Sequence, residues 1–203
     1  MRSLLLATTN PHKIEEFRAI FTDLPFQLLS LADVSLAAMD VEETGTTFQQ
    51  NAELKALAYA KASNMLSLAD DSGIEINALD GTPGVYSARF LGVDTSYEER
   101  FRVILERLHG LPNAQRTARY RCVICIAEPS GYHRSVDGTL EGIIADVPRG
   151  KGGFGYDPIF LVPEFGKTAA ELPPEVKNRI SHRGRAAKLA HPLLEDWPIS
   201  AQI

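Results

Sequence analysis

Apolar residues along this chain occur either in short continuous runs or at the three- and four-residue spacing of a helix. Continuous or alternating runs predict strands, and helical spacing predicts amphipathic helices. The predicted strands cover residues 3–7, 26–31, 65–69, 73–79, 117–127, 132–146 and 159–162. The predicted helices cover residues 11–22, 47–63, 96–109, 167–172 and 182–191. The pattern therefore predicts an α/β protein.

The two longest predicted strands are 117–127 and 132–146, and Pro129-Ser130-Gly131 lies between them. So short a connection is typical of a hairpin, which makes the two strands antiparallel. The sheet is therefore expected to be mixed rather than purely parallel. We find no internal repeat and no low-complexity linker, and the length predicts a single domain over residues 1–203.

The first predicted strand leads directly into a helix start. Asn10 is a suitable N-cap, and Pro11 falls at the first helical position, where its missing N–H costs nothing. Free N–H groups at such a start attract anions. Lys13 in the first turn opposes the helix dipole, and a bound phosphate would relieve that conflict. The alternative is a capped helix with a solvated lysine, and the loop lacks the Walker A pattern.

An aspartate pair, Asp70-Asp71, follows the apolar run 65–69 and precedes the turn signal Ser72-Gly73. Two adjacent carboxylates are costly to bring together unless a cation neutralises them. Mg²⁺ takes oxygen ligands of this kind and bridges to substrate phosphates. The pair therefore indicates metal-assisted chemistry on a phosphate ester. The alternative is an ordinary turn, since Asp, Ser and Gly are common turn residues.

A lysine occupies the apolar side of the predicted helix 47–63. Lys55 falls in the middle of the stripe formed by Phe48, Ala52, Tyr59 and Ala62. Such a lysine either extends to water or meets an anion. Just upstream, the segment VEETGTTF brings the adjacent acidic residues 42 and 43, which are either surface charges or a further carboxylate for the metal at Asp71.

A glycine-rich loop, RGKGGFGYD, covers residues 149–157 and carries Phe154 and Tyr156. Glycines allow close approach to a ligand, and the aromatic rings offer a stacking face for a base. The alternative is a flexible surface loop. Downstream, Lys177, His182 and Arg183 form a basic cluster around a predicted helix start, where an anion or a polar ligand edge would offset the unfavourable dipole.

Composition and charge limit the partners and the location that we expect for this chain. The net charge of −5 argues against non-specific nucleic-acid binding. We find no apolar run of the ~20 residues that a membrane helix needs and no secretory signal pattern, so we expect no membrane partner and a cytoplasmic location.

Cys122 and Cys125 lie three residues apart in a predicted strand, where they point to opposite faces, so we expect buried core residues rather than a metal or disulfide pair.

The sequence segments described above, taken together, resemble one family. The segments ATTNPHK, EETGTTFQQNAELKA, ADDSG, GVYSARF, GGFGYDPIF and KNRISHRGRA occur in the order and approximate spacing of the Ham1/RdgB-like inosine triphosphate pyrophosphatases. The resemblance extends from Leu4 to about Leu189. It implies hydrolysis of XTP, dITP and ITP to the monophosphate and pyrophosphate, a Mg²⁺ cofactor and a homodimer. It also implies an elongated mixed sheet flanked by helices, with two lobes around a central substrate cleft.

The resemblance also implies residue roles. Asp71 would bind Mg²⁺ and accept the proton of the attacking water, with Glu42 as the second metal ligand. Ser72 would touch the substrate. The residues expected on the triphosphate are Thr8, Thr9, Asn10, Lys13 and Lys55. The residues expected around the base are Phe154, Gly155, Tyr156, Asp157, Lys177, His182 and Arg183.

Two other functions remain open at this point. One is a Maf-like pyrophosphatase for modified pyrimidine nucleotides, which shares the general architecture. The other is a non-catalytic nucleotide-binding or interaction module. The SHR block and the GGFGYD loop favour the purine family over the first, and the intact carboxylates and lysines argue against the second.

Overall fold

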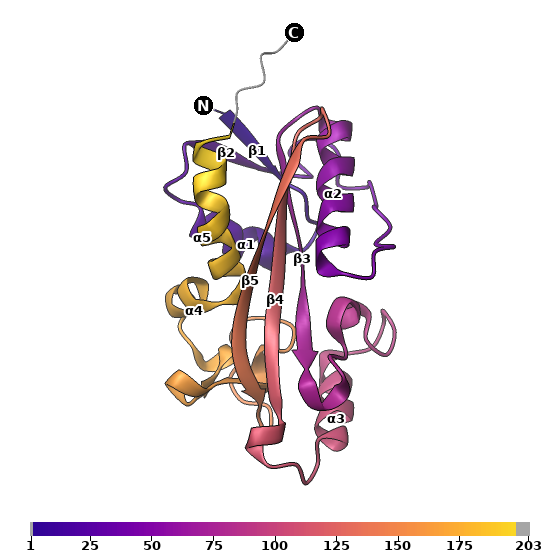
Figure 1. Cartoon of the computed structure of the whole chain (residues 1–203), viewed down its shortest axis with the longest axis vertical. Coiled ribbons are helices and arrows are strands. Elements are labelled where there is room, and N and C mark those ends of the chain that lie inside the picture. The colour runs from indigo at the N-terminus through magenta and orange to yellow at the C-terminus, as the bar shows by residue number, and fades with distance from the viewer. Residues whose placement is uncertain (1, 198–203) are drawn as a thin grey trace.

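A seven-stranded mixed sheet forms the centre of the molecule, which is elongated along its three long strands (Figure 1). The computed structural model describes residues 2–197. The strands are β1 (Arg2–Leu6), β2 (Phe26–Ser30), β3 (Ser67–Ile76), β4 (Thr117–Ala127), β5 (His133–Ile144), β6 (Phe160–Val162) and β7 (Lys167–Thr168), in the sheet order β2-β1-β3-β4-β5-β6-β7. β1 is parallel to β2 and β3, and the remaining pairs are antiparallel. The predicted hairpin and mixed sheet are confirmed.

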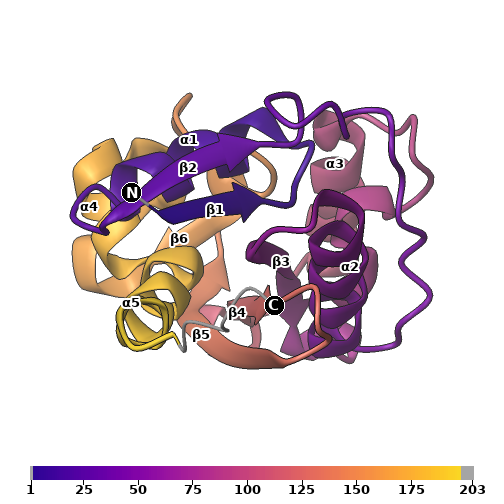
Figure 2. The same ribbon diagram turned by 90° about the horizontal axis from the view of Figure 1, so that it is seen from above.

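Helices cover both faces of this sheet (Figure 2). They are α1 (Pro11–Ile20), α2 (Phe48–Ser63), α3 (Tyr97–Arg107), α4 (Pro174–Ile180) and α5 (His182–Glu195). On one face, α1 and α5 bury Phe17 and Ala187 against Leu4 and Ile124 of the sheet. On the other face, α2 packs against residues that alternate with these in the strands, including Leu5 and Val123.

The two cysteines illustrate this alternation. Cys122 belongs to the core beneath α1 and α5, whereas Cys125 belongs to the core beneath α2. Both are buried free thiols. The prediction that they are core residues on opposite faces is confirmed.

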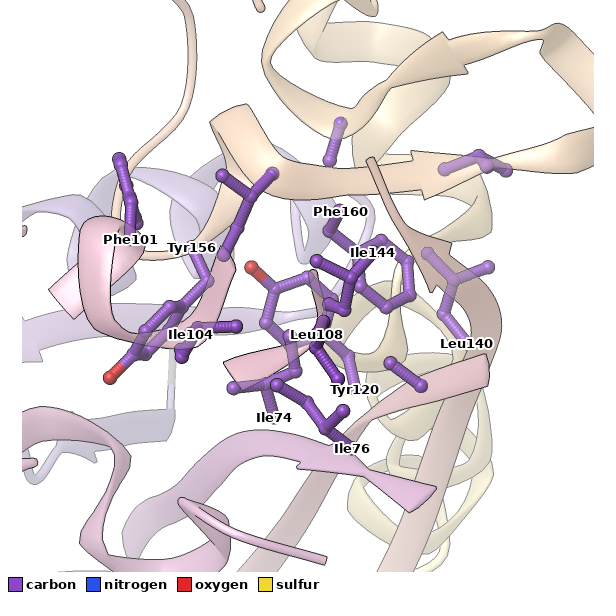
Figure 3. Close-up of a cluster of buried hydrophobic side chains, with 14 of the residues drawn as sticks. Ile74, Ile76, Phe101, Ile104, Leu108, Tyr120, Leu140, Ile144, Tyr156 and Phe160 are labelled. Carbon is purple, nitrogen blue, oxygen red and sulfur yellow. The ribbon is translucent and has the colours of Figure 1, made fainter. Parts of the chain in front are cut away.

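A further core fills the end of the molecule that carries α3 (Figure 3). Ile104 and Leu108 of the α3 region pack there against Ile74 and Ile76 of β3. Tyr120 and Tyr156 belong to the same core. Because both tyrosines also line the cavity described below, this core supports one wall of it.

The strand that carries the aspartate pair is longer than predicted. β3 continues through Ser72 and Gly73, which pair with Cys122 and Arg121 of β4. The predicted turn and the predicted break between strands 65–69 and 73–79 are wrong. Gly73 has another role: a Cβ there would lie 2.4 Å from Ser87 Oγ and 2.5 Å from Gly84 O, so the 3₁₀ helix Gly84–Arg89 packs directly on the bare backbone.

The predicted helix 167–172 is also wrong, since this segment forms β7 and a short 3₁₀ turn, Ala169–Glu171. The helix lies slightly later, as α4, and starts at Pro174, because proline fits the first helical position. α5 continues past the predicted end at 191 and includes Pro192. Residues 198–203 lie outside the described residues.

The start of α1 follows the sequence prediction. Asn10 Oδ1 accepts hydrogen bonds from His12 N at 3.0 Å and Lys13 N at 3.3 Å, and Pro11 is the first helical residue. The loop before the helix is closed by Asn10 N, which donates to Thr8 Oγ1 at 3.2 Å. Within the described part of the chain, no helix is long and apolar enough to cross a membrane.

Candidate active site

A single cavity of about 820 Å³ brings the predicted site residues together. Its walls come from the loop before α1, the middle of β3, one side of α2, the 3₁₀ helix Gly84–Arg89, the glycine-rich loop, α4 and the start of α5. The predicted residues that line it are Thr8, Thr9, Asn10, Lys13, Glu42, Lys55, Asp71, Ser72, Phe154, Gly155, Tyr156, Asp157, Lys177, His182 and Arg183. Segments distant in sequence therefore converge on one space, while the individual roles of these residues remain predictions.

Asp70 and Asp71 are not crowded together, because neighbouring residues of a strand point to opposite faces. Asp70 faces α1 and α5, where its Oδ2 lies 2.9 Å from Lys13 Nζ and 3.1 Å from an Arg183 nitrogen. Burial alone would raise the pKa of Asp70, but the attraction of Lys13 and Arg183 outweighs it and holds that pKa well below its usual range. In the structure, Asp70 is therefore the anion that Lys13 meets at the helix start.

Asp71 faces α2 and the cavity. Its Oδ2 accepts a hydrogen bond from Asn51 Nδ2 at 3.1 Å, and Lys55 Nζ lies 3.7 Å from its Oδ1. Burial raises the pKa of Asp71, and the charge of Lys55 only partly opposes this. Its Oδ1 also accepts a hydrogen bond from Ser72 N at 3.0 Å. A buried carboxylate with a raised pKa that is held by two directed donors has the character of a general base.

Lys55 meets anions rather than extending to water. Its Nζ lies 2.5 Å from Glu43 Oε1, and only a seventh of its side chain is exposed. Burial alone would lower the pKa of Lys55, but Asp71, Asp70 and Glu43 together raise it. Phe48, Ala52 and Tyr59 of the predicted apolar stripe are buried. Ala62 is exposed, so the stripe ends one turn earlier than predicted.

The two adjacent glutamates differ in their surroundings. Glu43 bridges two cations, because its other oxygen, Oε2, lies 3.1 Å from Arg89 Nη1. Glu42 is exposed, and it lines the same cavity. The predicted choice of Glu42 as the metal ligand is thus compatible with a structure in which Glu43 is already paired.

Phe154 also lines the cavity, and three side chains lie close to its ring. Its ring stacks on His12 with centroids 5.2 Å apart and an interplanar angle of 14°. Lys177 Nζ lies 4.9 Å from the centre of the ring, and the Arg183 guanidinium lies 5.6 Å from it. The part of the glycine-rich loop that carries Phe154 therefore packs against both α1 and the basic cluster, while residues 149–153 are exposed at the surface.

The buried side chain of Asp157 holds the glycine-rich loop in place. Its Oδ2 accepts from Phe154 N at 2.9 Å and from Lys177 Nζ at 2.5 Å, while Oδ1 accepts from Tyr120 Oη at 3.2 Å. Gly153 has a positive φ of 69°, and a Cβ at that position would lie 2.1 Å from Asp157 Oδ2. A glycine is therefore required for this close approach.

His182 is buried and stacks on Tyr120, with ring centroids 4.6 Å apart. Burial, together with the nearby charges of Arg183 and Lys177, lowers the pKa of His182 well below its usual value, so the ring is neutral. Among the described residues, its Nδ1 has no hydrogen-bond partner. A neutral imidazole that lines the cavity is suited to reading the edge of a base.

Sequence reasoning missed four contributors. Glu16 on α1 holds Lys177 Nζ at 2.9 Å and Arg183 Nη1 at 2.6 Å, and its position three residues after Lys13 on one helix face was an available signal. Asn51 lies one turn before Lys55, which was also an available signal. Nothing local marks Tyr120, and Arg89 lies in the block GVYSARF without an expected role; the partners of both come from distant segments.

The donor set fits a magnesium ion shared with a substrate. Within residues 2–197, no group of three or more His, Cys, Asp or Glu side chains is close enough to form an all-protein metal site. Mg²⁺ commonly uses only one or two carboxylates, with water and substrate phosphates completing its shell. Asp71 and Glu42, both at the cavity, match this requirement.

Comparison with known proteins identifies the family. The model of the Ham1 family matches residues 4–192. The chain belongs to the Ham1 family. It is 50% identical over 185 residues to a dITP/XTP pyrophosphatase of Exiguobacterium sp. (strain AT1b), which covers 91% of this chain and 93% of the relative. It is 49% identical over 189 residues to a dITP/XTP pyrophosphatase of Geobacter sulfurreducens, covering 93% and 94%.

Solved structures give the same result for this Ham1-family chain. A Ham1 protein from Coxiella burnetii superposes with a TM-score of 0.87 at 41% identity, covering 97% of this chain and all of that one. The Ham1 protein of Staphylococcus aureus superposes with a TM-score of 0.85 at 42% identity, covering 96% and 98%. The predicted family and the predicted α/β mixed-sheet fold are confirmed.

Proposed function

We propose that this Ham1-family chain hydrolyses non-canonical purine nucleoside triphosphates, namely XTP, dITP and ITP, to the monophosphate and pyrophosphate. The observation that carries the proposal is the layout of the cavity. Lys13, Lys55 and Asp71, which suit a phosphate chain and its hydrolysis, line the same cavity as the neutral His182 and the aromatic Phe154, which suit a base. The curated relatives named dITP/XTP pyrophosphatase support the same activity. Removal of such nucleotides keeps deaminated purines out of DNA and RNA.

The reaction follows from the surroundings of Asp71. A water molecule attacks the α-phosphorus, since the products are a monophosphate and pyrophosphate. Asp71 accepts the proton of that water, and the hydrogen bond from Asn51 holds its carboxylate in place. Lys13 and Lys55 stabilise the negative charge that develops on the leaving pyrophosphate. When bound by Asp71 and Glu42, Mg²⁺ supplies further neutralisation of the phosphate charge.

The protein selects the base of its substrate through the oxygen at C6 of the purine ring. Hypoxanthine and xanthine carry a carbonyl at C6, which donors around His182 and Arg183 can bind. Adenine carries an amino group there and leaves those donors unpaired, which costs about 1–3 kcal/mol for each buried group. Guanine shares the 6-keto group, so it must be excluded through its 2-amino group, where xanthine carries a keto oxygen.

Several finer properties belong to the same proposal. The chain requires Mg²⁺, forms a homodimer, acts in the cytoplasm on a small-molecule substrate and binds no nucleic acid. It functions as one domain over 1–203, which is supported by the continuous seven-stranded sheet and by the family match over residues 4–192.

A pyrophosphate-release assay with a panel of triphosphates tests the proposal. XTP and dITP should be hydrolysed far faster than ATP and GTP, only with Mg²⁺, and with release of pyrophosphate rather than orthophosphate. Preference for a modified pyrimidine triphosphate would favour a Maf-like activity instead. Binding of ITP without turnover would favour a non-catalytic module.

A further inference from the structure

One cation at the cavity has no place in the reaction described so far. Arg89 lies at the end of the 3₁₀ helix Gly84–Arg89 and lines the same cavity as Lys13 and Lys55. Its Nη1 is 3.1 Å from Glu43 Oε2, and its guanidinium lies over the Tyr86 ring at 5.2 Å. A third of its side chain is exposed, so the guanidinium is free to exchange partners at the cavity mouth.

The backbone that carries Arg89 is firmly fixed. Ser87 Oγ donates to Gly84 O at 2.6 Å and accepts from Ile74 N at 2.9 Å, which ties the 3₁₀ helix to β3. The carbonyl of Ser87 accepts from Tyr156 Oη at 2.9 Å and from the buried Arg100 at 3.3 Å. Arg89 is therefore presented to the cavity from a fixed backbone position.

Glu43 links this arginine to Lys55, one of the two lysines proposed to bind phosphate. One carboxylate holds both Lys55 and Arg89, at 2.5 and 3.1 Å. A single negative charge thus occupies two cations, and a triphosphate carries several charges that compete for the same partners. The planar guanidinium pairs with phosphate oxygens in bidentate geometry, which a lysine does not offer.

We propose that Arg89 is a further triphosphate-binding residue and that Glu43 is an internal anion that occupies Arg89 and Lys55 until the substrate displaces it. This deepens the proposed function and rests on it for the identity of the substrate. Displacement frees both cations for the phosphate chain. It also separates the roles of the adjacent glutamates: both line the cavity, but Glu43 holds the two cations whereas Glu42 is the proposed metal ligand.

Titration with inorganic tripolyphosphate in EDTA measures these contacts without turnover and without metal. The variants are Arg89→Gln and Glu43→Gln, with Arg102→Gln as the matched control. Arg102 is an exposed arginine on α3 whose ion pairs with Glu99 and Glu106 lie within its own helix. Calorimetry gives the dissociation constant, and thermal unfolding shows that each variant is folded.

Arg89→Gln should weaken tripolyphosphate binding at least ten-fold, which corresponds to about 1.4 kcal/mol. Glu43→Gln should tighten it at least three-fold, because the competing anion is gone. In the double variant the gain from Glu43→Gln should shrink, since one of the two released cations is missing. Arg102→Gln should bind as the wild type does.

The proposal is overturned if Arg89→Gln loses less than ten-fold, or if Glu43→Gln binds no more tightly than the wild type. Weaker binding by Glu43→Gln would point to a supporting role for that carboxylate instead. Should Arg89→Gln fail to fold, Arg89→Met keeps the packing on Tyr86 and is judged by the same criterion. Because no hydrolysis is measured, failure of the XTP and dITP assay is distinguishable from failure of this proposal.

Discussion

Asp70 and Asp71 are neighbours in the chain but have opposite surroundings. Asp70 is buried and paired with Lys13 and Arg183, so it stays charged and holds residues of α1 and α5 together. Asp71 is buried with a raised pKa, and it accepts hydrogen bonds from the Asn51 amide and the Ser72 backbone N–H. One carboxylate therefore serves as a fixed counter-ion, while its neighbour is suited to accepting a proton.

Replacement of the second aspartate tests this division. Asp71→Asn keeps the shape of the side chain but removes the charge that accepts the proton, so pyrophosphate release from dITP should be abolished while the fold remains intact. Asp137→Asn, at an exposed aspartate of β5, is the control and should retain activity. A variant that keeps more than about a tenth of the wild-type rate, a loss below ~1.4 kcal/mol, would show that Asp71 is not the base.

Lys55→Met tests the second phosphate lysine. Methionine suits the helix, but it leaves Glu43 and Asp71 without the cation that lies 2.5 and 3.7 Å away. The kcat/KM for dITP should fall at least ten-fold, equivalent to ~1.4 kcal/mol of transition-state binding. Lys61→Met, on the exposed side of the same helix, should have normal kinetics. Unchanged kinetics in the Lys55 variant would remove this lysine from the mechanism.

The buried neutral His182 makes stability depend on pH. Its folded-state pKa is lowered by burial, whereas the unfolded chain binds a proton near pH 6.5. Above that pH the group has no effect, and below it the free energy of unfolding should fall by about 1.4 kcal/mol per pH unit until the folded pKa is reached. Urea unfolding between pH 7.5 and 5 measures this slope. His182→Gln should flatten it, and His109→Gln, at an exposed histidine, should not. Equal slopes in all three proteins would contradict the prediction.

At the scale of elements, the position of α5 depends on a glycine in β5. A Cβ on Gly138 would lie 2.3 Å from both Ala186 N and His182 O, so Gly138→Ala must push the start of α5 away from the sheet. The free energy of unfolding should fall by about 1–3 kcal/mol, the usual cost of overpacking. The kcat/KM should fall as well, because His182 and Arg183 move. Glu141→Ala, exposed on the same strand, is the control, and equal stability of the two variants would argue against this contact.

Most elements could be predicted from sequence because their signals are local. The N-cap at Asn10 and the hairpin after Ala127 depend on residues next to one another in the chain. The break at Ser72-Gly73 was predicted wrongly, because a distant segment decides what that glycine does: the 3₁₀ helix Gly84–Arg89 packs on it. β7 was missed for a similar reason, since it exists only through pairing with β6.

The candidate site shows the same difference between local signals, which could be predicted, and contacts between distant segments, which could not. The family blocks, together with lysines at a helix start and on an apolar helix face, indicated residues that the cavity then brings together, such as Lys13 and Lys55. The partners of those charges were not predictable, because they are tertiary contacts. Asp70 as the partner of Lys13, and Arg89 as a partner of Glu43, depend on how β3 and the 3₁₀ helix meet.

At the scale of the whole molecule, we expect two chains to associate. Tyr86, Leu91 and Val93 lie within eight residues of sequence and are exposed apolar side chains, and an apolar surface of this kind favours association in water. Light scattering coupled to size exclusion should give twice the chain mass of 22.3 kDa. A mass equal to one chain at micromolar concentration would contradict the homodimer.

The long antiparallel strands have a mechanical consequence. β3, β4 and β5 run without interruption past the cavity, paired residue by residue from Ser67 to Ile76 and from Thr117 to Ala127. A rotation of one end of the molecule against the other would have to bend this ladder. We therefore expect substrate entry to depend on loop movement rather than on rotation of rigid halves. Amide exchange should show the strands equally protected with and without nucleotide, and the change confined to residues 40–45, 84–93 and 149–157.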